Sequence, residues 1–307
     1  MEKKYYFGID GGGTHSRIAL TDGEGNFLAE SKAGSTNIYS VTKDEVFRNL
    51  SALIDSVLAA AGIDRKDLAA GCLGSAGLGR EGEQKLFRGF FGSLLGEKCP
   101  VKLCTDAEIL LCGGLGDLEG YCLIAGTGSV AFGRSRDGRL IRAGGLGYML
   151  GDEGSAAWIG RTAIARTLRS LENRDLPTRM LPAILEAANL ADESGLVQYV
   201  HHDADKAQIA ALAPAVTEAA RGGDTLAMDI LRTGAEELAI LVKSVIDRSP
   251  FIKRMELVIA GGVIEHDEIL TTGLREILTL RLPGLAVSAP RGTALEGACI
   301  LAINTVK

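Results

Sequence analysis

Two glycine-rich segments hold residue types that could bind phosphate. Residues 10–14 read DGGGT, and residues 126–129 read GTGS. Glycines let backbone N–H groups approach phosphate oxygens directly, the Thr14 hydroxyl can donate one more bond, and Asp10 could hold Mg²⁺ through water. Each segment alone could be a simple turn beside an acid, but the pair could clamp one triphosphate from both sides. The residues predicted to bind phosphate are Gly11, Gly12, Gly13, Thr14, Gly126, Thr127 and Gly128.

An acid follows a short apolar run at Asp106, in the string LCTDAE. Folds of the α/β class assemble their sites at the carboxyl ends of strands. An acid there that faces a γ-phosphate could accept the proton of an attacking hydroxyl. The alternative is that Asp106 caps the helix that follows. The sequence leaves both interpretations open.

Acids and glycines also meet in GGLGYMLGDEGSAAWIG, residues 144–160. Asp152 and Glu153 precede an expected helix, where acids ordinarily stabilise the helix dipole. Carboxylates among glycines also suit a polyhydroxylated ligand, because an aspartate can accept two neighbouring hydroxyl hydrogens. Farther along, Gly261 and Gly262 follow an apolar run. They could lie against a flat group such as adenosine, although a plain β-turn is an alternative.

The segments around these residues predict an α/β fold. Residues 16–21 (SRIALT) alternate like a strand, residues 22–26 (DGEGN) are turn residues, and FLAES extends again. The first glycines therefore join two strands, which excludes the Rossmann fingerprint and the P-loop, because both need a helix directly after the glycines. A capping box at Thr42 opens a helix that Gly62 ends. The predicted order of the first unit is βββαβαβα.

The opening pattern recurs later in the chain. Residues 8–30 match residues 123–144 in style, each with an apolar strand, a glycine turn, a second strand and a hairpin glycine. This recurrence predicts two domains of the same type that flank a cleft, with a helical insertion at 155–247 in the second. A final helix at 293–303 is expected to return to the first domain. The predicted domains are 1–114 plus 290–307, and 115–289.

The composition favours a cytoplasmic protein that handles small molecules. The chain has 307 residues, 46% of them apolar, and a formal net charge of -6. It lacks an apolar run of the roughly 18 residues that span a bilayer. The acidic balance and the lack of a basic cluster argue against nucleic acid as the partner. The six cysteines show no CxxC spacing and are expected to be buried packing residues.

The motifs together resemble the actin/hexokinase superfamily, and within it the BadF/BadG/BcrA/BcrD group and its N-acetylglucosamine kinases. The resemblance covers nearly the whole chain, and GDEGSA is its most specific string. The matching pieces are IDGGGT (9–14), STN (35–37), GSAG (74–77), TDA (105–107), AGTGS (125–129) and GG-x-G-x-x-x-GDEGSA-x-WI (144–159).

This resemblance implies two ribonuclease-H-like domains that close over ATP and an amino sugar. Asp106 would take the proton from the C6 hydroxyl as it attacks the γ-phosphate, and Asp10 would orient hydrated Mg²⁺. Thr14 and Thr127 would hold ATP phosphates. Gly261 and Gly262 would border the adenosine, and a homodimer is the family expectation. The residues implied at the sugar are Asn37, Ser75, Asp106, Gly145, Leu146 and Asp152.

Two positions depart from the family pattern. His15 replaces the lysine or arginine that often follows the threonine, and we expect its side chain to point away from the triphosphate or only graze it. Leu146 stands where relatives can carry tryptophan. A smaller wall there could admit a bulkier substituent, such as the lactyl ether of N-acetylmuramic acid.

The sequence leaves several alternatives open. The preferred sugar could be N-acetylglucosamine, glucosamine or N-acetylmuramic acid, because pockets distinguish such groups by only about 1–3 kcal/mol. An ATPase activator of 2-hydroxyacyl-CoA dehydratases belongs to the same broad group but needs exposed cysteines for its iron–sulfur cluster. A non-catalytic filament protein or sugar-responsive regulator is a further alternative, although GDEGSA would have no purpose in a filament.

Overall fold

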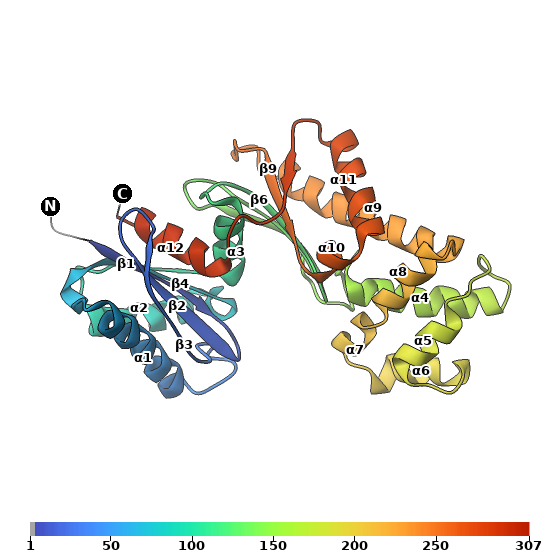
Figure 1. Ribbon diagram of the computed structural model, residues 1–307, viewed down its shortest axis with the longest axis horizontal. Helices are drawn as coiled ribbons and strands as arrows, with labels where there is room; N and C mark the ends of the chain where they lie inside the picture. Colours follow the sequence, from blue (N-terminus) through green and yellow to red (C-terminus); the bar gives the residue numbers. More distant parts are fainter. Residues whose placement is uncertain (1–3, 307) are drawn as a thin grey trace. The chain divides into compact units, whose positions relative to one another are not determined.

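The structure is a computed structural model that describes residues 4–306. The chain forms two compact units. The first unit reaches to Gly120 and also takes in Arg134–Gly138 and the chain from Pro290 onward. The second unit holds Tyr121–Gly133 and Arg139–Ala289. Each unit contains a five-stranded sheet, and Figure 1 shows the helices that accompany each one.

The strands of the two sheets are short and regular. They are β1 (Tyr5–Gly11), β2 (His15–Thr21), β3 (Phe27–Gly34), β4 (Leu68–Ser75), β5 (Val101–Cys104), β6 (Gly120–Ala125), β7 (Ser129–Arg134), β8 (Leu140–Gly144), β9 (Glu256–Ala260) and β10 (Ala286–Ser288).

The α-helices vary more in length. They are α1 (Lys43–Ala61), α2 (Glu81–Leu95), α3 (Asp106–Leu115), α4 (Ala156–Leu171), α5 (Leu181–Ala188), α6 (Leu196–Gln198), α7 (Lys206–Ala210), α8 (Ala213–Arg221), α9 (Thr225–Asp247), α10 (Gly262–His266), α11 (Glu268–Arg281) and α12 (Ala294–Asn304).

The first unit has the predicted βββαβαβα order. Its sheet runs β3-β2-β1-β4-β5, with β1 and β2 antiparallel and β4 and β5 parallel to β1. The register places Ile9 opposite Ile18, and neither side chain is exposed. Helix α1 covers this apolar face. Its N-terminus is capped by Thr42, which accepts the Glu45 N–H at 3.3 Å, and the left-handed Gly62 ends it.

The second unit repeats this topology. Its sheet runs β8-β7-β6-β9-β10, the same strand order as in the first unit when each unit's strands are counted from its own start. The second glycine segment again lies between the first two strands, after β6 and before β7. The predicted fold class, with two ribonuclease-H-like domains, is therefore confirmed.

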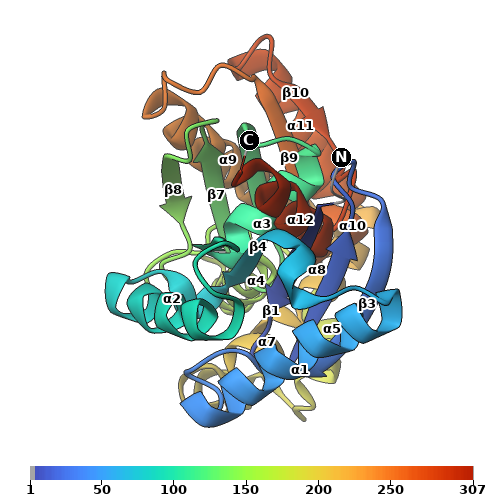
Figure 2. The ribbon, with the colours of Figure 1, turned by 90° about the vertical axis from the view of Figure 1, so that its left-hand side faces the viewer.

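The last helix, α12, packs against α3 within the first unit, and Figures 1 and 2 show the two helices side by side. Two glycines permit this close approach. A Cβ on Gly113 would lie 1.8 Å from the Thr293 carbonyl oxygen, and one on Gly297 would lie 1.8 Å from that of Ile109. The contact fixes α3, the helix that begins at Asp106.

The helical insertion of the second unit extends from α4 to α9. Its helices supply most of the apolar core of this unit, with α9 contributing ten buried residues from Leu226 to Val245. The insertion also brings α7 and α8 against α4. Elements far apart in sequence thus surround the start of α4.

One local prediction is wrong in detail. Gly261 and Gly262 do not form a turn between strands, because Gly262 is the first residue of α10. A short helix follows β9 directly, and Asp267 then caps a second helix, α11, by accepting the Leu270 N–H at 3.0 Å.

Within residues 4–306, no helix is both long and apolar enough to cross a membrane.

Candidate functional site

In the first unit, three parallel strands end side by side with the candidate residues. The register pairs Gly11 at the end of β1 with Ser75 at the end of β4, and pairs Gly74 with Cys104 at the end of β5. Asp106 follows two residues after Cys104. The first glycine turn, Ser75 and Asp106 therefore share the carboxyl edge of one sheet, where α/β folds place their sites.

Buried hydroxyls hold the first glycine turn in shape. The Gly12 N–H donates to the Ser16 hydroxyl at 3.3 Å, and Ser16 Oγ lies 2.8 Å from Thr36 Oγ1. The Ser35 hydroxyl donates to the Gly12 carbonyl at 3.2 Å. A Cβ on Gly12 would lie 2.2 Å from the His15 carbonyl oxygen, so no larger residue fits there. These bonds fix the conformation of the turn, and its glycines carry no side chain that could cover their own N–H groups.

Thr14 and His15, which follow these glycines, are both exposed. Thr14 is therefore accessible to a ligand, which a residue predicted to bind phosphate must be. His15 is the first residue of β2 and its side chain faces solvent.

Ser75 carries an unsatisfied polar atom. Its side chain is 1% exposed, and its hydroxyl has no hydrogen-bond partner within the described part of the chain. Leaving a buried hydroxyl unpaired costs about 1–3 kcal/mol, so such a group calls for an explanation. Its place at the strand edge suggests a ligand that completes the bond. Thr167 and Ser288 also lack partners, but they lie in the second unit, outside the candidate site.

The interpretation of Asp106 as the helix cap is wrong. Thr105 caps α3, because its hydroxyl accepts the Glu108 N–H at 3.4 Å. Asp106 is the first residue within the helix, and its Oδ1 accepts only the adjacent Ala107 N–H, at 2.9 Å, among the described contacts. The carboxylate is exposed and remains available for chemistry.

Asp10 is paired with a cation in this structure. Its Oδ2 accepts a hydrogen bond from Arg17 Nη2 at 2.8 Å, and the antiparallel register places the two residues opposite each other. Oδ1 takes no part in this bond and could accept one from a metal-bound water. The described residues contain no group of three metal-ligating side chains. This arrangement fits Mg²⁺, which usually takes one or two carboxylates and completes its shell with water and substrate phosphates.

Asn37 lies beside this edge on the loop after β3. Its Oδ1 accepts the Tyr39 N–H at 2.9 Å, and its own N–H donates to Ser35 Oγ at 3.1 Å. A Cβ on Gly77 would lie 3.2 Å from Asn37 Oδ1, so the asparagine packs against the segment that follows Ser75. The side chain is half-buried.

In the second unit, the glycine turn is built around Asp152. The Gly126 N–H donates to the Gly128 carbonyl at 2.9 Å, which closes the turn. The Ser129 N–H donates to Asp152 Oδ1 at 3.3 Å, and Lys206 Nζ donates to Asp152 Oδ2 at 2.7 Å. Asp152 is 3% exposed and has a left-handed backbone, with φ 63°. The buried carboxylate therefore lies directly beside the turn.

The glycine-rich loop before Asp152 also contacts this turn. The Gly145 N–H donates to the Ser129 carbonyl at 2.9 Å. Gly145 has φ 66°, a conformation that favours glycine. Leu146 follows it with 66% of its side chain exposed, so its apolar surface is open to a ligand.

Gly261 and Gly262 lie next to the second glycine turn. Gly261 has φ 106°, and a Cβ on it would lie 2.5 Å from the Ala125 carbonyl oxygen. The Gly262 nitrogen lies 3.8 Å from where a Cβ of Gly126 would be. Only glycine allows β9 to turn into α10 at this distance from β6.

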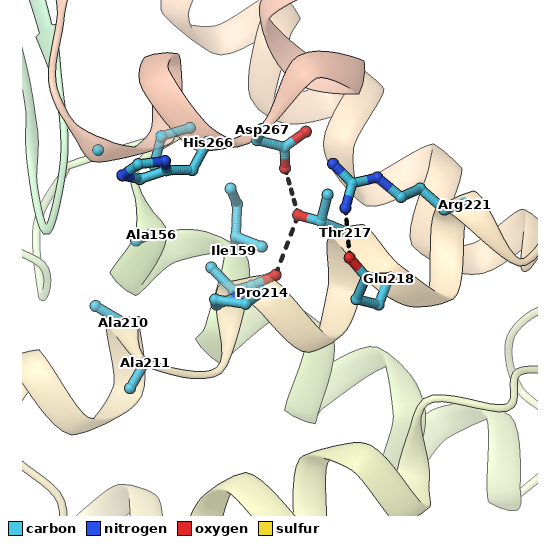
Figure 3. A pocket seen from close by; sticks show the side chains of 13 residues that line it. Ala156, Ile159, Ala210, Ala211, Pro214, Thr217, Glu218, Arg221, His266 and Asp267 are labelled. Carbon is cyan, nitrogen blue, oxygen red and sulfur yellow. Dashed lines mark hydrogen bonds and ion pairs between the residues drawn. The ribbon is translucent and has the colours of Figure 1, made fainter.

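A pocket of about 240 Å³ begins at Gly262. Its walls come from α4, α7, α8 and α10, and Figure 3 shows His266 and Asp267 on one side with Pro214 and Thr217 on another. The lining is largely apolar, and Asp267 accepts the Thr217 hydroxyl at 2.6 Å. The lining residues are Ala156, Ile159, Ala210, Ala211, Ala213, Pro214, Thr217, Glu218, Arg221, Gly262, Val263, His266 and Asp267.

The candidate residues thus fall into two groups, one on each unit. The first unit holds Asp10–Thr14, Asn37, Ser75 and Asp106. The second unit holds Gly126–Gly128, Gly145, Leu146, Asp152, Gly261 and Gly262. The residues implied at the sugar are therefore divided between the two units.

The sequence analysis overlooked two cations that lie against these groups. Arg17 could have been found, because a hairpin with its turn at 11–14 pairs Asp10 with Arg17. Lys206 lies 54 residues from its partner Asp152 and leaves no local signal in the sequence. Trp158, at the end of GDEGSAAW, packs against the core, and the neighbouring histidines His201 and His202 are exposed.

A pair of sheets with the same strand order, each with a glycine turn between its first two strands, defines the class of actin-like ATPases. Within this class, the chain belongs to the BadF/BadG/BcrA/BcrD ATPase family, whose sequence profile matches residues 7–299.

Individual relatives resemble the chain over its full length. An N-acetylmuramic acid/N-acetylglucosamine kinase from Clostridium acetobutylicum is 35% identical over 301 residues, which cover 97% of this chain and 98% of that protein. An N-acetyl-D-glucosamine kinase from Dictyostelium discoideum is 30% identical over 319 residues and is covered completely, as is this chain. Among solved structures, a candidate N-acetylglucosamine kinase from Chromobacterium violaceum superposes with a TM-score of 0.67 at 27% identity, covering 98% of this chain and 99% of that one.

Proposed function

We propose that this protein is an ATP-dependent amino-sugar kinase that transfers the γ-phosphate of ATP to the C6 hydroxyl of N-acetylglucosamine or a close relative. The names of the two full-length relatives support the substrate class. The observation that carries the proposal is the carboxyl edge of the first sheet. There an exposed acid, Asp106, shares the strand edge with a glycine turn and with the buried Ser75 hydroxyl, which has no hydrogen-bond partner among the described residues.

Asp106 acts as the general base in this proposal. Its carboxylate accepts the proton of the C6 hydroxyl as the C6 oxygen forms a bond to the γ-phosphorus. The bond between that phosphorus and the oxygen that bridges it to the β-phosphate breaks, and ADP leaves. Because Thr105 already caps α3, the Asp106 carboxylate is not needed to hold the helix.

The nucleotide is held by both glycine turns in this proposal. Backbone N–H groups of Gly11–Gly13 and Gly126–Gly128, with the hydroxyls of Thr14 and Thr127, bind its phosphates. Gly261 and Gly262 border the adenosine, and the apolar pocket that begins at Gly262 accepts the adenine ring.

Asp10 would hold Mg²⁺ through water in this proposal. When bound, the ion neutralises charge on the β- and γ-phosphate oxygens. Arg17 orients the carboxylate by occupying its other oxygen.

Six residues line the sugar in this proposal. Polar and charged groups bind its hydroxyls, and the exposed Leu146 provides an apolar surface. These residues are Asn37, Ser75, Asp106, Gly145, Leu146 and Asp152.

N-acetylmuramic acid is a second sugar that we propose as a substrate. The relative from Clostridium acetobutylicum is named for both sugars. Leu146 is smaller than the tryptophan expected at this position in some relatives and leaves room for the lactyl ether. Glucosamine remains a further candidate, because the groups that distinguish these sugars differ by only about 1–3 kcal/mol of binding.

We also propose that the protein works in the cytoplasm as a homodimer, with an amino sugar and ATP as its partners rather than nucleic acid or a membrane. ATP is supplied there, and a formal net charge of -6 disfavours binding to nucleic acid. Light scattering coupled to size-exclusion chromatography checks the dimer, since a single species with the mass of one chain contradicts it.

An ADP-release assay over a panel of sugars tests the proposed function. The panel holds N-acetylglucosamine, N-acetylmuramic acid, glucosamine, N-acetylmannosamine and glucose. We expect the highest kcat/KM with N-acetylglucosamine or N-acetylmuramic acid and the lowest with glucose. ADP release that no sugar accelerates would rule out the kinase. If N-acetylglucosamine were phosphorylated and N-acetylmuramic acid were not, only the second substrate would be ruled out.

A further inference from the structure

Lys206 lies at the second glycine turn, although it belongs to the helical insertion and no sequence motif includes it. Its Nζ is 2.7 Å from Asp152 Oδ2 and 2.7 Å from where a Cβ of Gly128 would stand. The ammonium group therefore almost touches the backbone that we propose binds phosphate. Any side chain at position 128 would collide with the Lys206–Asp152 pair, so Lys206 can occupy this position only because residue 128 is glycine.

The charge of Lys206 is needed at this place. Asp152 is 3% exposed, and the Gly128 Cβ position lies 2.9 Å from Asp152 Oδ2. A buried carboxylate this close to the turn would repel a triphosphate, because charges interact more strongly away from water. Lys206 neutralises the carboxylate and removes that repulsion.

Lys206 also has capacity to bind more than Asp152. An ammonium group has three N–H donors, and the bond to Asp152 uses one of them. The Lys206 side chain is 35% exposed, so it is partly open to solvent. Capping-box bonds between Asp205 and Gln208, each at 2.8 Å, fix the start of α7, the helix that Lys206 begins.

We propose that Lys206 binds an oxygen of the β- or γ-phosphate of the nucleotide and supplies the cation that the first glycine turn lacks at His15. This inference rests on the proposed function, because it assumes that the second turn binds a nucleoside triphosphate. Asp152 holds Lys206 in place through their bond of 2.7 Å. With nucleotide bound, it bridges Asp152 and the phosphate.

A competing role for Lys206 is to hold Asp152 for the sugar alone. The two roles differ in which substrate loses affinity when the charge is removed. A phosphate contact changes the affinity for ATP and leaves AMP and the sugar nearly unaffected, since AMP lacks the β- and γ-phosphates. A role through Asp152 changes the KM of the sugar.

The test uses two substitutions of Lys206 and a matched control in the full-length protein. Lys206→Gln removes the charge but keeps a donor for Asp152, which protects the fold. Lys206→Arg keeps the charge. Lys243→Gln is the control, because Lys243 also pairs with an aspartate, Asp247, in the same unit but on an exposed helix face.

Calorimetric titration measures ATP binding, and saturation-transfer NMR measures the weaker binding of AMP. Hydrogen bonds to charged groups are worth enough to predict a loss of roughly 10- to 100-fold in ATP affinity for Lys206→Gln. AMP affinity and the KM of the sugar are expected to stay within about twofold. Lys206→Arg is expected to restore most of the ATP affinity, and Lys243→Gln to match the wild type.

Three results would overturn the inference while the wild type binds ATP. These are unchanged ATP affinity in Lys206→Gln, an equal loss of ATP and AMP binding, and a rise in the KM of the sugar alone. Wild-type protein that does not bind ATP would instead overturn the proposed function, and this inference with it.

Discussion

At the scale of single residues, the proposed chemistry rests on two side chains of the first unit, those of Asp106 and Ser75. Asp106 is exposed at the first position of α3, whose cap is Thr105. Ser75 is buried without a hydrogen-bond partner among residues 4–306. A residue that contributes little to stability at a strand edge is available for binding and catalysis, and this property makes both residues testable.

The first prediction concerns Asp106→Asn. Loss of the general base is expected to lower kcat by about 10²–10⁴-fold, while the KM values for ATP and the sugar change little. Steady-state kinetics measures both parameters. Asp44→Asn is the matched control, because Asp44 is an exposed acid in the first turn of α1 in the same unit. If Asp106→Asn kept full activity, another group would be the base.

The second prediction concerns Ser75→Ala. Removing an unsatisfied buried hydroxyl is expected to leave the free energy of unfolding unchanged or to raise it by about 1 kcal/mol. The KM of the sugar is expected to rise roughly tenfold, because the ligand loses one hydrogen bond. Denaturant unfolding and kinetics give the two values. A stability loss with an unchanged KM would show that Ser75 serves the fold alone.

At the scale of elements, glycines set how closely strands and helices approach the proposed nucleotide site. Gly261 lets β9 turn into α10 with its backbone against the Ala125 carbonyl. Its φ of 106° and ψ of 161° lie in a region that only glycine adopts readily. The backbone conformation of Gly261 and its contact with Ala125 each exclude a side chain, so there are two separate reasons for glycine at this position.

The third prediction separates these two effects. Gly261→Ala is expected to cost about 3 kcal/mol or more of unfolding free energy, because strain and a clash add together. Gly284→Ala is the comparison, since Gly284 has a φ of 93° but no atom within 4 Å of a Cβ. That variant is expected to lose only about 1 kcal/mol. Equal losses in chemical denaturation would show that the contact with Ala125 is unimportant.

Local patterns in the sequence predicted most of the elements. The capping box at Thr42 and the glycine at 62 gave both ends of α1, because caps are local signals. Alternation in residues 16–21 gave β2, and the recurrence at 123–144 gave the duplicated sheet. These features depend on neighbouring residues, which a single sequence displays.

Other features depended on contacts that local patterns do not display. An acid before a helix looks like a cap, and only the backbone shows that Thr105 takes that role instead of Asp106. Gly261 lies against Ala125 because β6 and β9 pair in parallel, which brings distant residues together. Lys206 meets Asp152 through the packing of α7 on α4, and no local pattern announces such a pair.

At the scale of the whole molecule, the cysteines help to distinguish a sugar kinase from an ATPase activator of 2-hydroxyacyl-CoA dehydratases. All six are buried and free of disulfides. Burial raises the pKa of the Cys112 and Cys122 thiols to about 12. A buried thiol that stays protonated neither reacts readily nor ligates a metal, because the thiolate is the reactive form. This state disfavours a shared iron–sulfur cluster and hence an activator of 2-hydroxyacyl-CoA dehydratases.

The fourth prediction follows from this burial. Iodoacetamide is expected to label none of the six cysteines in the native protein at mildly alkaline pH, and all six in guanidinium chloride. Mass spectrometry counts the labels. Rapid labelling of a native cysteine, or brown protein that contains iron after anaerobic purification, would support the activator instead.

The most direct test of the central claim is the identity of the phosphorylated product. We predict that the protein, ATP, Mg²⁺ and N-acetylglucosamine yield a sugar phosphate whose phosphorus signal correlates with the C6 protons in proton–phosphorus NMR. One ADP is expected for each sugar phosphate formed. Inorganic phosphate without a sugar phosphate, or phosphate attached at C1, would contradict the proposed transfer to the C6 hydroxyl.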